Sequence, residues 1–210
     1  MLLALDGKSG LVRPLPERAL DFALSGALLL ELAFMKKIDA DVENIHLANL
    51  KGISDPTLKD AVAALPRGRM DFPIETALER LATKGAKWKR RVLASLIKKG
   101  IVERRRLRVF FFIRRRAFPV VDMPKVESLR ARIRKIVADE GEIPSPREVV
   151  LVALMNACAL GSTVFTEDEL DTYRERIDSI SRMDLIALSI TRRIADIQNA
   201  ITAAMAVSGI

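Results

Sequence analysis

The sequence is poor in the residues that most often build catalytic and metal sites. Its 210 residues include one histidine, His46, and one cysteine, Cys158. A histidine-based triad or a metal cluster of His and Cys therefore has no second member. The acidic residues are numerous but show no spacing that pairs two carboxylates. We therefore expect a protein that is not an enzyme and needs no cofactor or metal, with His46 at the surface and Cys158 buried as a small hydrophobe.

Long apolar segments are also missing. The longest apolar run, residues 149–160, is well below the roughly 20 residues that cross a bilayer. The N-terminus "MLLALDGKSG" is too short and becomes polar too soon to be a signal peptide. A single cysteine cannot form a disulfide framework, which favours a reducing compartment. These features predict a soluble, cytoplasmic protein that is at most peripheral to a membrane.

What the sequence does contain is a strongly basic region. The chain is 50% hydrophobic and 30% charged, a balance typical of globular proteins, and its net charge is +8. Residues 84–116 hold fourteen Lys or Arg and one acid, a local net charge of +13. The rest of the chain must then carry a net charge of −5. Because the basicity is regional, we expect an anionic partner to bind in this region.

Helix signals recur along most of the chain. Asp55 with Pro56 forms a capped helix start, and Asp122 with Pro124 forms another. The apolar body of "IPSPREVVLVALMNACALG" indicates a central buried helix. The helices that we expect lie over or within residues 15–36, 54–65, 74–83, 87–99, 122–141, 143–161, 166–180 and 182–206.

Residues 101–116 break this pattern. Ile101–Val102 and Val109–Ile113 are β-branched or aromatic runs, and their short separation predicts a β-hairpin. Arginines flank the second run in "RRRLRVFFFIRRR". The predicted fold is therefore mainly α-helical, one globular domain over residues 1–210 that carries one basic, aromatic β-hairpin.

The hairpin raises the question of what covers its second face. A two-stranded ribbon packed on helices buries one face only, so some of the apolar side chains need another surface. An anionic bilayer interface suits both residue types, because Phe enters the acyl boundary and Arg meets the headgroups. Burial against the domain or against a second subunit is an alternative. For Trp88, on the basic helix before the hairpin, both the core and a lipid-headgroup contact are open.

Several stretches, in this order, resemble the Golgi phosphoprotein 3 family. They are "SGALLLELAFMKKI", "TLKDAVAAL", "RRVLASLIKKGIVERRRLRVFFFI" and "REVVLVALMNACALGSTVF". The resemblance spans about residues 2–206. It implies a mainly α-helical, non-enzymatic domain with a pocket for phosphatidylinositol 4-phosphate beside a hydrophobic hairpin that enters the bilayer or mediates self-association. It also implies adaptors that hold membrane proteins by their cytosolic tails.

The pocket positions that the family implies are only partly cationic here. Its Trp falls near Pro16, its first Arg at Ser25, and its Arg pair at Ala86 and Lys89. Neighbouring cations could rebuild the pocket by short shifts. The chain also lacks a long N-terminal extension, so we expect a prokaryotic member, for which a Golgi location would not apply.

We therefore expect a peripheral protein that binds an anionic phospholipid membrane, with a phosphoinositide-like headgroup, on its cytosolic face. The expected headgroup contacts are Arg13, Arg18, Lys87, Lys89 and Arg90. The expected membrane-inserting residues are Phe110, Phe111 and Phe112. Self-association through the hairpin is a further expectation. The alternative function is a winged-helix-like nucleic-acid-binding protein, which explains the arginines but not the phenylalanines.

Overall fold

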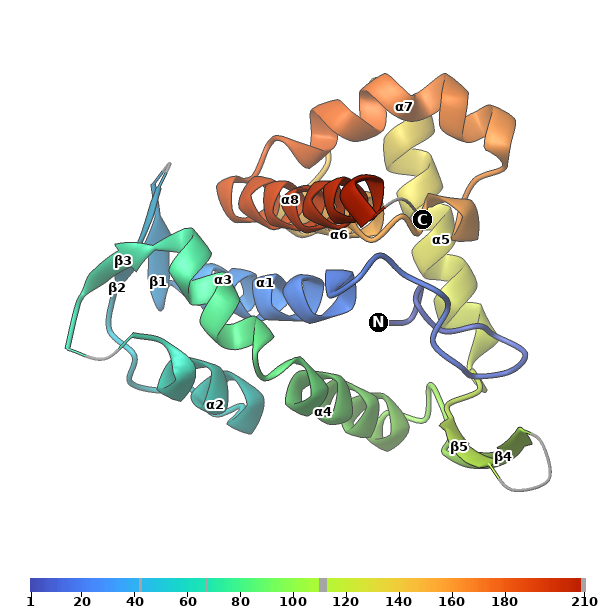
Figure 1. Cartoon of the computed structure of the whole chain (residues 1–210), viewed down its shortest axis with the longest axis horizontal. Coiled ribbons are helices and arrows are strands. Elements are labelled where there is room, and N and C mark those ends of the chain that lie inside the picture. Colours follow the sequence, from blue (N-terminus) through green and yellow to red (C-terminus); the bar gives the residue numbers. More distant parts are fainter. Residues whose placement is uncertain (42, 67, 110–112, 209–210) are drawn as a thin grey trace.

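Several helices pack around one buried helix, α1 (Ala19–Phe34) (Figure 1). The computed structural model describes residues 1–41, 43–66, 68–109 and 113–208. In this part of the chain the other elements are β1 (Ile38–Ala40), β2 (Asn44–Leu47), α2 (Pro56–Ala64), β3 (Asp71–Pro73), α3 (Ile74–Ala82), α4 (Gly85–Lys98), β4 (Arg105–Val109), β5 (Ile113–Ala117), α5 (Met123–Ala138), α6 (Pro146–Ala157), the 3-10 turn η1 (Gly161–Thr163), α7 (Glu167–Ser181) and α8 (Leu185–Ser208). The prediction of a mainly α-helical domain is confirmed.

Helix α1 is buried because its sequence is apolar on nearly every side. Phe22, Leu29 and Leu32 are fully buried, and α1 contacts α2, α3, α4, α6, α8 and β1. The helix begins at Ala19 rather than at residue 15. Arg18 takes a left-handed backbone conformation with φ of 57°, which a helix cannot continue through, and Pro16 therefore lies before the helix.

A small three-stranded antiparallel sheet was not expected from the sequence. Its order is β1-β2-β3, with Ile38 paired to Leu47 and Ile45 paired to Phe72. The strands have only three or four residues, too short for an alternating pattern to stand out. Ile38, Ile45 and Phe72 are buried in the main core, so the sheet packs against α1 through these side chains.

The hairpin is present, but its strands differ from the prediction. Strands β4 and β5 pair from Arg105 with Ala117 to Val109 with Ile113, so they are mostly arginine. Ile101 and Val102 are instead buried in a small cluster of apolar residues, and Val102 bridges Val120. The apolar pair thus anchors the base of the hairpin, and residues 110–112 connect its strands.

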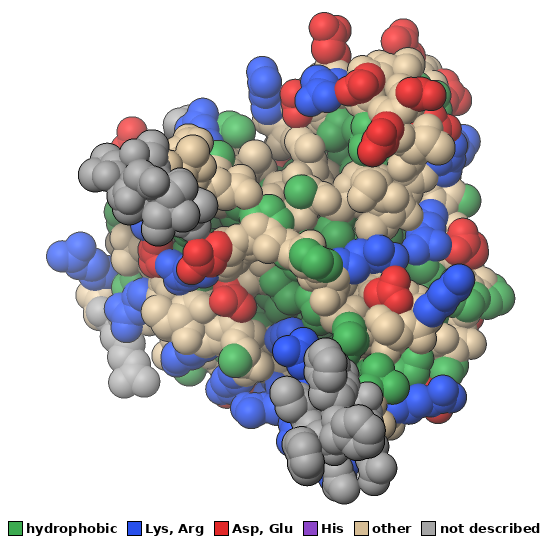
Figure 2. All heavy atoms as spheres, turned by 45° about the vertical axis from the view of Figure 1, so that its right-hand side comes forward, with side chains coloured by type: hydrophobic (Ala, Val, Ile, Leu, Met, Phe, Trp, Pro, Cys, Tyr) green, Lys and Arg blue, Asp and Glu red, His purple; other side chains and the backbone are tan. Residues whose placement is uncertain are grey.

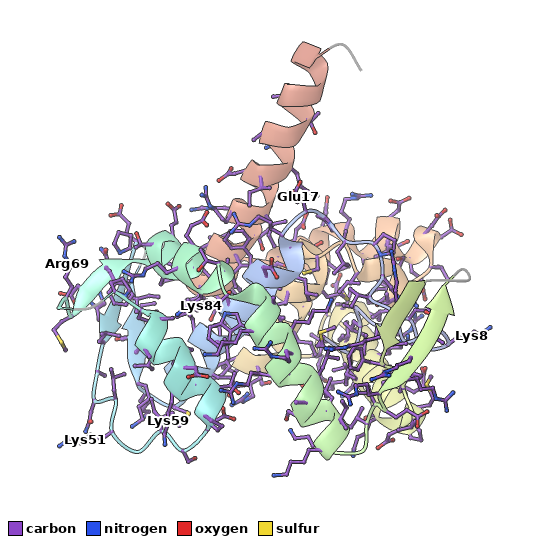
Figure 3. All side chains as sticks on the ribbon, turned by 60° about the horizontal axis from the view of Figure 1, so that its bottom comes forward. Lys8, Glu17, Lys51, Lys59, Arg69 and Lys84 are labelled. Carbon is purple, nitrogen blue, oxygen red and sulfur yellow. The ribbon has the colours of Figure 1, made fainter. Side chains whose placement is uncertain are left out.

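The C-terminal half is helical, as expected. Helix α6 lies between α1, α5, α7 and α8, and its Val152, Ala153 and Met155 are buried. Pro146 stands in the first turn of α6, after a capping box formed by Ser145 and Glu148. Helix α8 projects from the body of the molecule (Figure 3). Every helix in the described ranges is too short or too polar to cross a membrane.

Candidate functional site

The rotation of α4 about its axis is set by Trp88. This side chain is fully buried, and its indole Nε1–H donates a hydrogen bond to the Leu81 carbonyl oxygen at 2.8 Å. Of the two interpretations of Trp88, the core one is therefore right and the lipid-headgroup one is wrong. Successive residues of an α-helix are rotated by about 100°. The side of α4 that carries Ala86, Arg90 and Ile97 consequently faces away from the core.

The N-terminal end of α4 is held against α1. The helix begins at Gly85, two residues before the predicted start, and Gly85 lies against the Asp21 side chain of α1. A Cβ at this position would overlap the Asp21 side chain, so any other residue here would force that side chain to move. The close approach places the first turn of α4, with its basic residues, at a defined position.

One side of α4 uses its positive charges in ion pairs. Lys87 lies 2.9 Å and Arg91 2.5 Å from the Asp60 carboxylate of α2. The pKa of Asp60 is lowered, chiefly by the hydrogen bond from Lys87 and also by the charge of Arg91. The Lys87 ammonium also lies 5.4 Å from the centre of the Trp88 ring. Lys87 thus links α4 to α2.

Two other expected headgroup residues are also paired with acids. The Arg13 guanidinium lies 3.3 Å from the Asp6 carboxylate, within the N-terminal segment. Arg18 lies 3.4 Å from Glu79 of α3, and its guanidinium stacks 4.8 Å from the centre of the Phe22 ring. Glu79 accepts a second hydrogen bond, at 2.8 Å, from Arg193 of α8.

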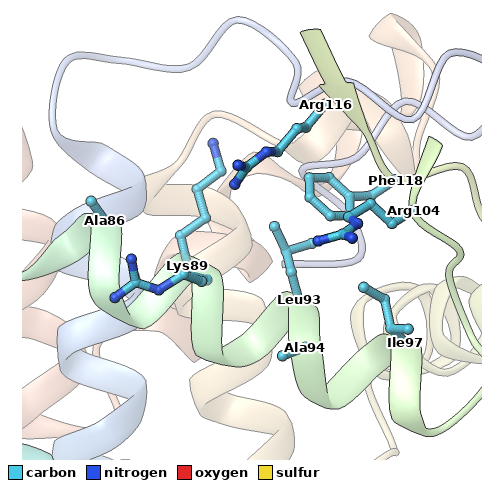
Figure 4. Close-up of a pocket in the computed structure, with 9 residues that line it drawn as sticks. Ala86, Lys89, Leu93, Ala94, Ile97, Arg104, Arg116 and Phe118 are labelled. Atoms are coloured by element: carbon cyan, nitrogen blue, oxygen red, sulfur yellow. The ribbon is translucent and has the colours of Figure 1, made fainter. Parts of the chain in front are cut away.

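The outward side of α4 and the base of the hairpin enclose a pocket of about 380 Å³. Its cationic lining residues are Lys89, Arg90, Arg104 and Arg116. Its apolar lining residues are Ala86, Leu93, Ala94, Ile97 and Phe118. Figure 4 shows the Lys89 and Arg116 side chains extending into the same space between α4 and the hairpin. The structure therefore brings Lys89 and Arg90 together and leaves Arg13, Arg18 and Lys87 outside this lining.

The four pocket cations, like Lys84, Lys98 and Lys99 of the same basic segment, have no acidic partner among the described residues. The ion pairs of that part of the chain include Lys87, Arg91 and Arg105, but none of Lys89, Arg90, Arg104 or Arg116. Lys and Arg side chains gather near the hairpin, and acidic ones near α7 (Figures 1 and 2). Several positive charges around one hollow repel each other, and a bound anion relieves this repulsion with charge-assisted hydrogen bonds.

Three of the lining residues come from the hairpin base. From the sequence, the flanking arginines are expected only to attract an anionic surface, and Phe118 is not singled out. Arg104 precedes β4, Arg116 lies on β5 and Phe118 follows β5. The charge of Arg104 and Arg116 is evident in the arginine blocks around "VFFFI", but the approach of all three residues to α4 is not. The expected inserting residues Phe110, Phe111 and Phe112 lie outside the described residues.

A second hollow of similar volume, about 380 Å³, lies where α2 meets the end of α3. It is lined by Arg80, Thr83 and Lys84 with Ala63 and Ala64, so it presents two cations and no large apolar side chain. It is the alternative location for a small anion. The pocket beside the hairpin has twice the positive charge and an apolar floor.

The remaining reactive side chains are accounted for structurally. The side chain of His46 is 41% exposed and lies 2.8 Å from the carboxylates of Asp71 and Asp41. Hydrogen bonds to these two carboxylates raise the pKa of His46, and the bond to Asp71 has the larger effect. Cys158 is buried, and burial raises the pKa of its thiol to about 11. Both positions agree with the sequence-based expectation. In the described part of the chain, no three His, Cys, Asp or Glu side chains are grouped to hold a metal ion.

Comparisons with known proteins add one match. A model of the family described as Golgi phosphoprotein 3 (GPP34) matches residues 1–197. A search of curated proteins finds no match to the chain. The matched range includes every residue that lines the pocket beside the hairpin.

The arrangement predicts that opposite sides of α4 have different roles. Trp88→Phe removes the indole hydrogen bond and leaves a void in the core, so we expect the free energy of unfolding to fall by about 1–3 kcal/mol. Urea unfolding followed by far-ultraviolet circular dichroism measures this change. Arg90→Gln, on the outward side, is the control and should leave the unfolding free energy within about 0.5 kcal/mol. Equal effects of the two substitutions would contradict the orientation of α4.

Proposed function

This chain belongs to the Golgi phosphoprotein 3 family, and from this premise we propose that it is a peripheral membrane protein that binds anionic phospholipid. The family match covers 197 residues and agrees with the resemblance seen in the sequence. The observation that carries the proposal is the pocket between α4 and the hairpin, where four cations have no acidic partner among the described residues. A cluster of Lys and Arg can bind a phosphate group through several charge-assisted hydrogen bonds.

The proposal has a general and a specific level. At the general level, the basic pocket attracts the anionic surface of a membrane, on its cytosolic face. At the specific level, the family resemblance implies phosphatidylinositol 4-phosphate as the lipid and the cytosolic tails of membrane proteins as clients. The role is that of a non-catalytic adaptor, in which lipid binding places the protein at the membrane.

The hairpin supports the same proposal from the sequence. Its connection, residues 110–112, consists of three phenylalanines, and its strands β4 and β5 are rich in arginine. We propose that Phe110, Phe111 and Phe112 enter the acyl region while the arginines attract anionic headgroups. Each basic residue near an anionic surface contributes on the order of 1 kcal/mol.

The first prediction is charge-dependent membrane binding. We expect the protein to co-sediment with vesicles of phosphatidylcholine and phosphatidylserine, increasingly with the anionic fraction and less at high salt. Lys89→Gln with Arg90→Gln should weaken binding by roughly 30-fold, since two charges near the surface are lost. Lys51→Gln with Lys59→Gln is the matched control, because these lysines lie around α2, away from the hairpin (Figure 3). Equal binding to neutral and anionic vesicles, or binding to neither, would refute the proposal.

The second prediction concerns the phenylalanines. Phe111→Ser with Phe112→Ser should weaken vesicle binding by at least about tenfold, because burying a Phe side chain contributes about 1.5–3 kcal/mol. The helical circular dichroism signal should stay unchanged. Loss of that signal would instead mean that the two side chains are part of the core, and a smaller particle in light scattering would mean that they join two copies of the chain. Binding to duplex DNA with a steep salt dependence, unaffected by the Phe substitutions, would favour the winged-helix alternative.

A further inference from the structure

The hairpin is attached to the rest of the molecule through its base. Strands β4 and β5 pair with each other along their length, and neither has extensive contact with another helix or strand in the described ranges. The base packs instead into a small apolar cluster, separate from the main core, that contains Leu93 of α4 together with Ile101 and Val102. The position of the hairpin over α4 therefore depends on what else belongs to this cluster.

The N-terminal segment, blue in Figure 1, belongs to it. Leu5 is a buried member of the cluster, and Val12 packs against it. Leu5 and Val12 also pair with each other and so close the loop "DGKSG" between them. Inside the loop, the Asp6 side chain accepts a hydrogen bond of 2.7 Å from the Ser9 N–H, and the Asp6 carbonyl oxygen accepts one of 2.7 Å from the Gly10 N–H. The loop is thus a compact turn fixed by its own hydrogen bonds.

Gly10 is the residue through which this loop meets the hairpin base. Its carbonyl oxygen accepts a hydrogen bond of 2.7 Å from the Phe118 backbone N–H. Its backbone has a φ of 67°, in the left-handed region, and a Cβ at this position would overlap the backbone of Phe118 and Pro119. Because the overlap is with backbone, no rotation of a neighbouring side chain can relieve it. Any other residue at position 10 would push the loop and the hairpin base apart.

We propose that Gly10 is a positioning residue, which holds the hairpin base in place and thereby completes the anion-binding pocket. The proposal rests on the proposed function, because it explains how the site for the anionic lipid is formed. Phe118 lines the pocket and also packs against the apolar cluster, as does Leu93. Figure 4 shows Arg116 and Phe118 on the hairpin side of the pocket, across from Lys89 on α4. Moving the hairpin base away from its contact with Gly10 therefore separates Arg116 from Lys89.

Such an anchor is needed because the pocket cations repel one another. Arg104 and Arg116 come from the hairpin, and Lys89 and Arg90 come from α4, so their repulsion acts to push the hairpin base off the helix. The contact at Gly10 opposes this repulsion before any anion is present. Donors that are already in place lose less conformational freedom when the anion binds, which strengthens binding.

Hydrogen exchange tests the positioning role without any lipid. Gly10→Ala should raise the exchange rate of the Phe118 amide at least about tenfold, because its acceptor is displaced, and should leave the amides of α6 unchanged. Gly52→Ala is the control for backbone strain, since Gly52 has a φ of 80° but open space around its Cβ position. Gly7→Ala, in the same loop, meets no atom within 4 Å. Both controls should leave the Phe118 rate within about twofold of the wild-type rate.

Asparagine at position 10 separates strain from overlap. Asparagine tolerates the left-handed region but adds a Cβ, so Gly10→Asn should raise Phe118 exchange as much as Gly10→Ala does. A wild-type rate in Gly10→Asn or in Gly10→Ala, or an equal rise in Gly52→Ala, would show that Gly10 does not hold the hairpin and would overturn the proposal.

Lipid binding tests the consequence for the pocket, with short-chain phosphatidylserine below its micelle concentration as the probe. Arg116→Gln should weaken binding roughly tenfold in the otherwise wild-type chain, because a charge-assisted hydrogen bond is lost. In the Gly10→Ala chain the same change should weaken binding less than about twofold, since Arg116 is already displaced. Equal factors in the two chains would mean that Gly10 affects stability alone, and the proposal would then be wrong.

Two further results keep the test decisive. If Gly10→Ala loses the helical circular dichroism signal, Val12→Ala takes its place, because it loosens the cluster without changing the backbone. Val12→Ala should raise Phe118 exchange about threefold or more, and an unchanged rate would contradict the proposal. A wild-type chain that binds neither the probe nor anionic vesicles would overturn the proposed function and with it the role of Gly10 in binding. The exchange rates would still show whether Gly10 holds the hairpin.

Discussion

The burial of Trp88 determines how the rest of the basic region can be used. With its indole inside the core and its N–H bonded to the Leu81 carbonyl, α4 cannot rotate about its own axis without losing this packing. One flank of the helix then meets Asp60 of α2 through Lys87 and Arg91. The side opposite Trp88 faces the hairpin, and its residues Arg90, Leu93 and Ile97 line the pocket.

The distribution of acids completes this arrangement. Arg13, Arg18 and Lys87 each have a carboxylate partner, so their charges are already partly neutralised within the fold. The four cations that line the pocket have no carboxylate partner among the described residues. Only water and dissolved ions then offset their mutual repulsion. Proteins keep such unpaired clusters where an anion binds, because the same repulsion that costs stability favours the ligand. We therefore propose phosphate binding at this pocket rather than along the whole basic segment.

Much of the fold could be predicted from sequence, because helix starts such as Asp55-Pro56 are local signals. The left-handed Arg18 and the short strands β1 to β3 could not, since they depend on contacts formed only in the folded chain. The hairpin was expected at the right place with the wrong strands, because β propensity favoured the apolar run over the arginines. Family resemblance pointed to Ala86 and Lys89, and both line the pocket. Arg104, Arg116 and Phe118 join them only through the docking of the hairpin base on α4, which no local pattern reveals.

The central claim is that the pocket between α4 and the hairpin is where this protein meets the phosphate of a lipid. Nuclear magnetic resonance of the isotope-labelled chain, titrated with a short-chain anionic phospholipid below its micelle concentration, measures this directly. The account predicts saturable shifts of the Arg90, Arg104 and Arg116 guanidinium signals and of the α4 amides around Leu93. Shifts confined to the hollow at Arg80 and Lys84, or spread over the surface without saturation, would contradict it.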